Sequence, residues 1–195
     1  MKPVRLLMFS GSARRGSWNQ RLVEVAAKKA SELGAEVVVI NLADFDIPLY
    51  NQDLEAEAFP PAVRDLRERM IAADGILLAC PEYNGSITPL LKNVIDWTSR
   101  PQENVADGLV AYQGQVAALI AASPGGLGGM RGLVHVRAIL SGIGVTVIPE
   151  DLAVGSAYQA FHEEGGLAEE RLSQRLDNVV KGLIRTAHAL RQEDS

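Results

Sequence analysis

Short apolar runs alternate with amphipathic helical patterns along the chain, and this alternation constrains the fold more than any other feature. Runs with the length and continuous apolar character of buried strands occupy residues 4–9, 36–41, 75–79, 116–122 and 145–148. Helical spacing of apolar residues predicts helices over residues 19–33, 63–70, 88–98, 130–141 and 168–191. Continuous apolar strands joined by helices are typical of a parallel sheet that is covered on both faces. The sequence therefore predicts an α/β doubly wound fold with five parallel strands.

One domain accounts for the whole chain, because residues 1–195 contain no internal repeat, low-complexity tract or linker. A chain of 195 residues is long enough to bury a full hydrophobic core. Its composition, 47% apolar and 22% charged, is that of an ordinary globular protein. Periodicity leaves the strand order open between two doubly wound arrangements, the flavodoxin-like order 2-1-3-4-5 and a truncated Rossmann order.

Charge and residue usage argue against several classes of function. A net charge of −5 argues against broad nucleic-acid binding, which requires a basic face. No apolar run reaches the roughly 20 residues needed to cross a bilayer, and no signal peptide is recognisable, so no membrane association is expected. The single cysteine, Cys80, cannot form an internal disulfide, which favours the cytoplasm. The three histidines, His135, His162 and His188, form no metal-ligand pattern.

The loop after the first predicted strand, residues 10–19, has the composition of a phosphate-binding loop. Its glycines allow the backbone to approach a ligand closely, and free amides at the start of the following helix attract a phosphate. Polar side chains that would complete such a site are Ser10, Ser12, Arg14 or Arg15, Ser17 and Asn19.

Three other interpretations of this loop are possible. Gly11 and Gly16 match the spacing of a nucleoside-triphosphate loop, but Ser17 stands where that loop needs its lysine. The dinucleotide pattern of three glycines is absent, because Ser12 replaces the middle glycine. Ser17 followed by Gln20 is also a capping-box pattern, which accounts for Ser17 but not for the arginines and the other polar residues.

Two further loops follow the third and fourth predicted strands. Residues 80–86 combine a tyrosine, an amide and a tight glycine turn, which suit the face and edge of a flat heterocycle, although an ordinary polar turn has the same composition. Residues 123–131 hold four glycines, which implies bare backbone that faces a ligand or a close-packed neighbour, or else a flexible connection. Ligands of doubly wound folds bind beyond the carboxyl ends of the strands, where all three loops begin.

Together these loops resemble the NADPH-dependent FMN reductase family, whose members include quinone, azo-dye and chromate reductases. The stretch S-G-S-x-R-x-x-S-x-N at residues 10–19 is similar to the phosphate loop of the family. The stretch P-E-Y-N-G-S at residues 81–86, followed by L-K-N-x-x-D-W at residues 91–97, is similar to its second signature. Residues 123–131, S-P-G-G-x-G-G-x-R, resemble its third flavin loop.

The resemblance implies the flavodoxin-like order 2-1-3-4-5 and one FMN per subunit. It places Ser10, Ser12, Arg14, Ser17 and Asn19 at the phosphate. It places Pro81, Glu82, Tyr83, Asn84, Gly85 and Ser86 beside the isoalloxazine ring, with Ser123, Gly125 and Gly126 at the other edge of the ring. Asn93 and Asp96 are expected to fix the following helix rather than to touch flavin. No catalytic side chain and no metal are expected, since the hydride chemistry belongs to the flavin N5.

The function that follows is an NAD(P)H-dependent FMN reductase that transfers two electrons from NADPH or NADH to small acceptors, such as a quinone, an azo dye, a flavin or a metal oxyanion. The alternative is a flavodoxin-type electron carrier that docks redox partners. Relatives of this family usually form homodimers or homotetramers, so an oligomer is expected. Two segments, residues 101–114 and 154–166, depart from many relatives and prevent any transfer of substrate range.

Overall fold

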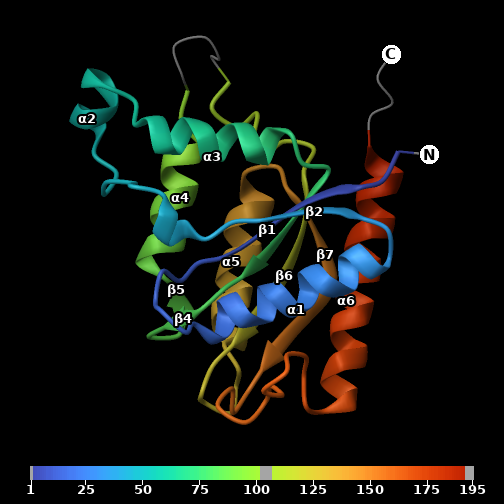
Figure 1. Cartoon of the computed structure of the whole chain (residues 1–195). Helices are drawn as coiled ribbons and strands as arrows, with labels where there is room; N and C mark the ends of the chain where they lie inside the picture. The colour runs from blue at the N-terminus through green and yellow to red at the C-terminus, as the bar shows by residue number, and fades with distance from the viewer. Residues whose placement is uncertain (1, 102–106, 192–195) are drawn as a thin grey trace.

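The computed structural model describes residues 2–101 and 107–191 and contains a central five-stranded parallel sheet (Figure 1). The strands follow the order β2-β1-β3-β6-β7, which confirms the predicted order 2-1-3-4-5 and excludes the Rossmann alternative. Their bounds are Arg5–Ser10 for β1, Glu36–Val39 for β2, Gly75–Ala79 for β3, Val116–Ala122 for β6 and Thr146–Val154 for β7.

Helices cover both faces of the sheet, as a doubly wound fold requires (Figure 1). On one face lie α1 (Trp18–Glu32) and α6 (Glu170–Leu190). On the other face lie α3 (Pro61–Ile71), α4 (Pro89–Thr98) and α5 (Met130–Gly142). All five helices were predicted from apolar spacing.

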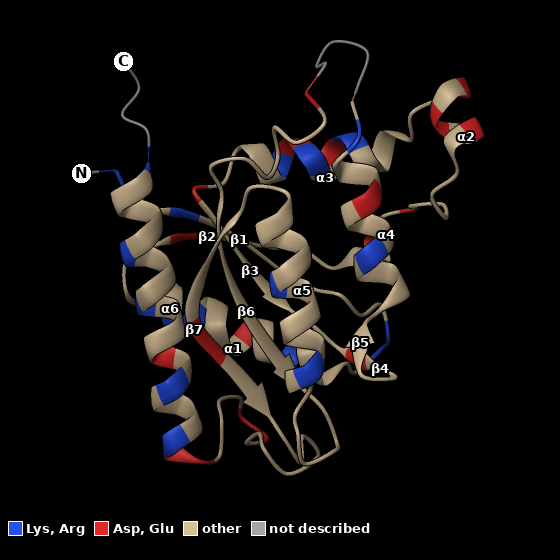
Figure 2. Ribbon diagram, turned by 180° about the vertical axis from the view of Figure 1, so that it is seen from behind, with Lys and Arg blue, Asp and Glu red and all other residues tan. Residues whose placement is uncertain are grey.

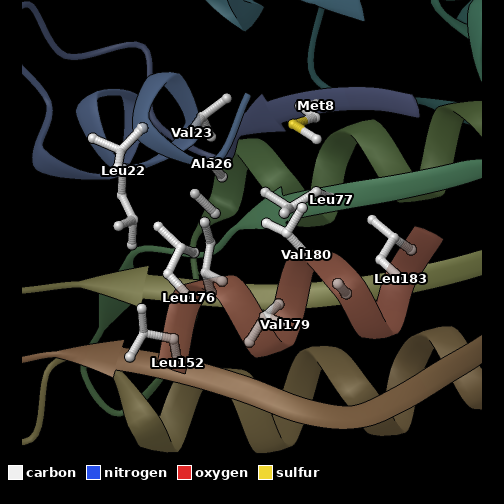
Figure 3. Close-up of a cluster of buried hydrophobic side chains, with 14 of the residues drawn as sticks. Met8, Leu22, Val23, Ala26, Leu77, Leu152, Leu176, Val179, Val180 and Leu183 are labelled. Carbon is white, nitrogen blue, oxygen red and sulfur yellow. The ribbon is translucent and has the colours of Figure 1, made fainter. Parts of the chain in front are cut away.

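Two apolar layers form because successive side chains of a strand point to opposite faces. Leu6 and Met8 of β1 belong to the layer under α1 and α6, whereas Leu7 and Phe9 belong to the layer under the other three helices. Figure 3 shows the first layer, in which side chains of α1 and α6 converge on the strands. Complete burial of one such side chain stabilises the fold by about 1.5–3 kcal/mol, and this burial anchors the strands whose ends carry the predicted ligand loops.

Local signals set the starts of two of the helices that follow predicted ligand loops, α1 and α4. The Ser17 hydroxyl accepts a hydrogen bond from the Gln20 amide at 3.4 Å and caps α1. Thr88 caps α4 through the Leu91 amide, and Pro89 occupies the first helical position, where its missing N–H is not needed. Both caps confirm the sequence interpretation.

Three parts of the structure differ from the sequence expectation. β7 continues to Val154, whereas the apolar run predicted its end at residue 148. A short antiparallel hairpin, β4 (Glu82–Tyr83) and β5 (Ser86–Ile87), lies in the second loop. A short helix, α2 (Gln52–Glu57), follows the 3-10 turn η1 (Leu42–Asp44) within a segment predicted to be loop. None of the α2 side chains is buried, so the segment has no apolar periodicity that would predict a helix.

Figure 2 shows basic and acidic positions interspersed along α3, α4 and α6. Two of the helical ion pairs have i, i+4 spacing, Asp65 with Arg69 on α3 and Lys92 with Asp96 on α4. In the described ranges, none of the helices is both long and apolar enough to span a membrane.

Candidate functional site

The three predicted ligand loops emerge side by side at the carboxyl edge of β1, β3 and β6. The Gly11 amide donates to the Ala79 carbonyl at 2.9 Å, and the Cys80 amide donates to the Ile120 carbonyl at 2.8 Å. These bonds continue the ladders of the sheet past the ends of the strands. Because the strand order reverses at β1, with β2 added on one side of it and β3 on the other, the carboxyl ends of β1 and β3 form the topological switch point at which ligands bind in open α/β folds.

The first loop has one buried polar atom that the described residues leave unpartnered. The Ser10 side chain is completely buried at the end of β1, and its hydroxyl finds no hydrogen-bond partner among them. Such an atom is destabilising unless a ligand or water satisfies it. Arg14 and Arg15 are exposed, and the Arg14 guanidinium donates to the Gly16 carbonyl at 2.9 Å. The start of α1 follows directly and adds the positive end of its dipole, so the loop fits a phosphate.

Asn19 links the first loop to the third. Its side-chain amide donates to the Ala122 carbonyl at 2.8 Å, and its side-chain oxygen accepts from the Ala122 amide at 2.9 Å. Asn19 is buried, and Ala122 is the last residue of β6. The side chain therefore ties the first turn of α1 to the point where the third loop begins.

The first loop also packs tightly against α4. A Cβ atom at Gly11 would lie 2.8 Å from the Leu91 Cβ, and the Thr88 hydroxyl donates to the Gly11 carbonyl at 2.8 Å. Only glycine fits at this close approach. Ser12 is half-buried next to it, so the backbone of the loop is held while its following residues face solvent.

The second loop is the β4–β5 hairpin. Its turn residues, Asn84 and Gly85, have φ values of 53° and 77°, as expected for the Asn-Gly turns that favour two-residue hairpins. Pro81 is buried before the hairpin, and Tyr83 exposes 55% of its surface. Because Tyr83 is mostly exposed, its ring is available to a ligand.

Two side chains of the hairpin, Glu82 and Ser86, lie within hydrogen-bond distance of residues of α5. The Glu82 carboxylate accepts hydrogen bonds from the Arg131 guanidinium and from the Gly132 amide. The Ser86 hydroxyl lies 2.8 Å from the His135 Nδ1. Arg131 is not among the predicted site residues, although it is the last residue of the third motif.

The four glycines of the third loop fall into two pairs with different structural roles. Gly125 and Gly126 are exposed, and a Cβ atom at Gly126 would meet nothing within 4 Å. At Gly128, with φ +64°, a Cβ atom would lie 2.7 Å from the backbone that ends β7. At Gly129 it would lie 2.8 Å from the Ala121 Cβ. The first two therefore leave backbone open to a ligand, and the last two allow close packing. Ser123 opens the loop and accepts a hydrogen bond from the Gly125 amide at 3.2 Å.

A cavity of about 1210 Å³ borders the first loop and extends along the outer side of α1. Arg14, Arg15 and Arg21 line it, but the residues of the second and third loops do not. One of its walls is the segment after β7, where Phe161 stacks on Trp18 with a centroid separation of 5.8 Å. Segment 154–166 therefore packs against the first turn of α1.

Several residues have structural partners away from the loops. The Asn93 side chain donates to the Pro48 carbonyl at 2.9 Å and accepts from the Tyr50 amide at 2.7 Å, so it holds segment 48–50 against α4. Asp96 pairs with a lysine on the same helix. Cys80 is completely buried, and burial raises the pKa of its thiol. Part of the predicted insertion, residues 102–106 of 101–114, lies outside the described residues. Within the described ranges, no group of three or more His, Cys, Asp or Glu side chains is placed to hold a metal ion.

A five-stranded doubly wound sheet with these loops at its switch point defines a flavodoxin-like nucleotide-binding protein. The family model described as NADPH-dependent FMN reductase matches residues 4–159. The chain therefore belongs to this oxidoreductase family, in which FMN is the cofactor and NAD(P)H the electron donor.

Similar proteins agree with this assignment. An NAD(P)H-dependent FMN reductase of Pseudomonas aeruginosa is 37% identical over 182 residues, which cover 92% of this chain and 93% of the relative. An NAD(P)H:quinone oxidoreductase of Solanum tuberosum is 36% identical over 186 residues, covering 92% and 91% of the two chains. The structure of FerB, a flavoenzyme NAD(P)H:(acceptor) oxidoreductase of Paracoccus denitrificans, superimposes with a TM-score of 0.82 at 27% identity and covers 95% of this chain and 98% of FerB.

Proposed function

We propose that this chain binds FMN at the carboxyl edge of β1, β3 and β6 and uses it to reduce quinones with electrons from NAD(P)H. The observation that carries the proposal is the meeting of three loops at the switch point, with the buried Ser10 hydroxyl unpartnered by the described residues. Quinones are the proposed acceptor class because relatives from several organisms bear quinone reductase names. Azo dyes, flavins and metal oxyanions are further acceptors to be assayed.

The phosphate end of FMN is assigned to the first loop. Ser10, Ser12, Arg14 and Ser17 supply hydroxyl and guanidinium donors, and the first amides of α1 add their dipole. Asn19 is proposed to act indirectly: both polar groups of its side chain bind the end of β6, so it holds the first loop in place rather than contacting the phosphate. Arg14 is the proposed charge partner, which places one cation beside a terminal phosphate.

The ring end of FMN is assigned to the second and third loops. The hairpin from Pro81 to Ser86 borders one side of the ring, with Tyr83 and Asn84 closest. Ser123, Gly125 and Gly126 offer open backbone at the other edge of the ring. When bound, FMN supplies the hydride-accepting and electron-donating chemistry, and backbone amides of these loops stabilise negative charge on the ring.

Assembly and location are proposed as well. Met130 and Val134 on α5 expose 53% and 62% of their surfaces, so α5, together with α4, is the proposed contact of a homodimer. Light scattering at micromolar concentration should give at least twice the mass of one chain, and a monomeric mass would contradict this assembly.

The cytoplasm is the proposed location, because Cys80 is the sole cysteine and is buried. Residues 1–195 are proposed to unfold as one domain.

The first test is the identity of the flavin and of the acceptor. The purified protein should be yellow, should release FMN rather than FAD on denaturation, and should oxidise NADPH or NADH when a quinone is added. Chromatography of the released flavin identifies the cofactor, and the loss of absorbance of the reduced nicotinamide at steady state measures its oxidation. Absence of FMN affinity would refute the proposal, whereas reduction by NADPH without turnover of any small acceptor would favour an electron carrier.

The second test separates the phosphate end from the ring end. Replacing Arg14 with Ala should weaken FMN binding by about 1.5–3 kcal/mol, because a hydrogen bond to a charged group has that value. At saturating FMN, the Arg14→Ala variant should recover most of the turnover of the unaltered protein. Tyr83→Ala should keep FMN bound but lose turnover that added FMN does not restore. Arg15→Ala is the matched control and should change FMN affinity less than threefold, since the proposal assigns it no phosphate contact.

A further inference from the structure

The β4–β5 hairpin and the first turns of α5 are joined by two polar links. In the first, the Arg131 Nε donates to the Glu82 carboxylate at 2.9 Å, and the Gly132 amide donates to the same carboxylate at 3.1 Å. In the second, Ser86 and His135 lie within hydrogen-bond distance at 2.8 Å. The two links hold both strands of the hairpin to one side of one helix.

Glu82 is an unusual member of a ligand loop because its carboxylate is shielded from water. Its side chain exposes only 8% of its surface, whereas the Arg131 side chain exposes 62%. Burial alone would raise the pKa of Glu82, but the hydrogen bonds from Arg131 and from the Gly132 amide outweigh burial and hold the pKa below its usual value. A buried charge with good partners is strongly destabilising when one partner is removed.

Backbone shape brings the two elements close enough for these links. A Cβ atom at Gly132 would lie 3.4 Å from both the Glu82 Cβ and the Ser86 carbonyl oxygen. Gly129, at the N-cap of α5, lies so close to β6 that its Cβ would be 2.8 Å from the Ala121 Cβ. The third loop therefore ends on a helix that is fixed to the sheet on one side and to the hairpin on the other.

We propose that Glu82 is a positioning residue that sets the gap between the second and third loops, and through that gap the fit of the isoalloxazine ring. Glu82 acts through Arg131 and the Gly132 amide rather than by touching the ring. This inference rests on the proposed function, because the gap matters only if a flavin ring occupies it. It assigns the ion pair to ring binding and leaves phosphate binding to the first loop.

Flavin affinity measured with and without the phosphate separates these two roles. Glu82→Gln keeps the shape of the side chain but removes its charge, and Arg131→Lys keeps the charge but loses the forked donor geometry. Each should raise the dissociation constants of FMN and of riboflavin by the same factor, roughly 5- to 30-fold, which corresponds to the coupling of a close ion pair. Fluorescence quenching of each free flavin provides the measurement.

Two controls bracket the expected result. Glu150→Gln removes the carboxylate that pairs with Arg185 between β7 and α6, remote from the loops, and should change neither constant by more than twofold. Arg14→Ala should weaken FMN far more than riboflavin, because riboflavin has no phosphate. In the double variant Glu82→Gln, Arg131→Lys, the loss of affinity should be smaller than the product of the two single losses, as expected for two residues acting as a pair.

The outcomes distinguish this inference from the proposed function. If the unaltered protein binds no flavin, the proposed function fails. If it binds FMN, and Arg131→Lys binds both flavins as tightly as the unaltered protein does, the inference alone fails. A selective loss of FMN affinity in Glu82→Gln also overturns it, because that pattern would place the effect at the phosphate. Should Glu82→Gln not fold, Arg131→Lys decides, since its side chain is largely exposed.

Discussion

Replacing Asn19 with Ala is the change that most directly tests how the ligand edge is built. Asn19 is buried in the first turn of α1, and its amide makes two hydrogen bonds, 2.8 and 2.9 Å long, to the backbone of Ala122. Alanine removes both partners and leaves a buried N–H and a buried C=O on β6 unsatisfied. Strand β6 is otherwise buried along its whole length, so water has little access to these groups.

The size of the effect follows from these contacts. Leaving a buried backbone group without a partner costs about 1–3 kcal/mol, so two groups give roughly 2–4 kcal/mol when the site relaxes in part. Alanine is the better helix former by about 0.6 kcal/mol, which offsets some of this loss. We therefore expect Asn19→Ala to lower the free energy of unfolding by about 1.5–3.5 kcal/mol.

Urea unfolding of Asn19→Ala followed by circular dichroism measures this loss, and Asn51→Ala is its control. Asn51 caps α2 through the Asp53 amide, but α2 buries no side chain, so fraying of that helix should change global stability by less than about 0.5 kcal/mol. A loss below about 0.5 kcal/mol in Asn19→Ala as well would refute the reasoning, because it would mean that the link between the first and third loops contributes nothing to the fold.

Three other predictions concern the rest of the fold. Gly128→Ala should destabilise the protein by more than about 3 kcal/mol in denaturant unfolding, because it combines a positive φ with a 2.7 Å clash, whereas Gly165→Ala, with a positive φ and open space, should lose only about 1 kcal/mol. Burial would raise the pKa of Asp74, but hydrogen bonds from Arg191 and a backbone amide lower it, so its contribution is complete above about pH 5 and is lost as the pH falls through the depressed pKa. The stability difference between the protein and Asp74→Asn should shrink as the pH falls from 5 towards 2, and a constant difference would contradict this origin. Cys80, buried with a raised pKa, should react with a thiol reagent only after unfolding, and rapid reaction of the native protein would contradict its burial.

Regular elements of the fold could be predicted from the sequence because each buries an apolar stripe or run. The five strands and the five long helices follow from that periodicity, and the strand order follows from the family resemblance. α2 could not be predicted in the same way because it packs no side chain into the core. Its remaining signals were local ones, the Asn51 cap and the acidic residues Asp53 and Glu55 in its first turn.

The site could be predicted only as a set of loops. Asn84-Gly85 is a strong hairpin signal, but its flanking strands have two residues each and show no alternation that would reveal them. The partner of Glu82 could not be predicted, since Arg131 lies 49 residues further along the chain and only the packing of α5 on the hairpin brings the two together. The roles of the glycines in the third loop could not be predicted either, because each role depends on which backbone or side-chain atoms lie next to that glycine in the fold.

The end of β7 was missed because Pro149 and the two acidic residues after it interrupt the apolar run. The ladder shows how the strand absorbs them: Ala117 pairs with Val147 and Leu119 pairs with Asp151, so four residues of β7 span two of β6. Such an irregularity is tolerated because β7 lies at the end of the sheet, where proline removes no required ladder bond.

The irregularity in β7 also disfavours aggregation through the exposed edge of the sheet. A regular outermost strand presents a row of free amides and carbonyls on which a strand from another molecule can pair, and this is a common start of aggregation. Pro149 deprives the outer side of β7 of one amide, and the irregular register beside it twists the strand away from a flat template. A strand from another molecule therefore cannot form a continuous hydrogen-bond ladder along β7, and edge-to-edge growth of the sheet into fibres is disfavoured here.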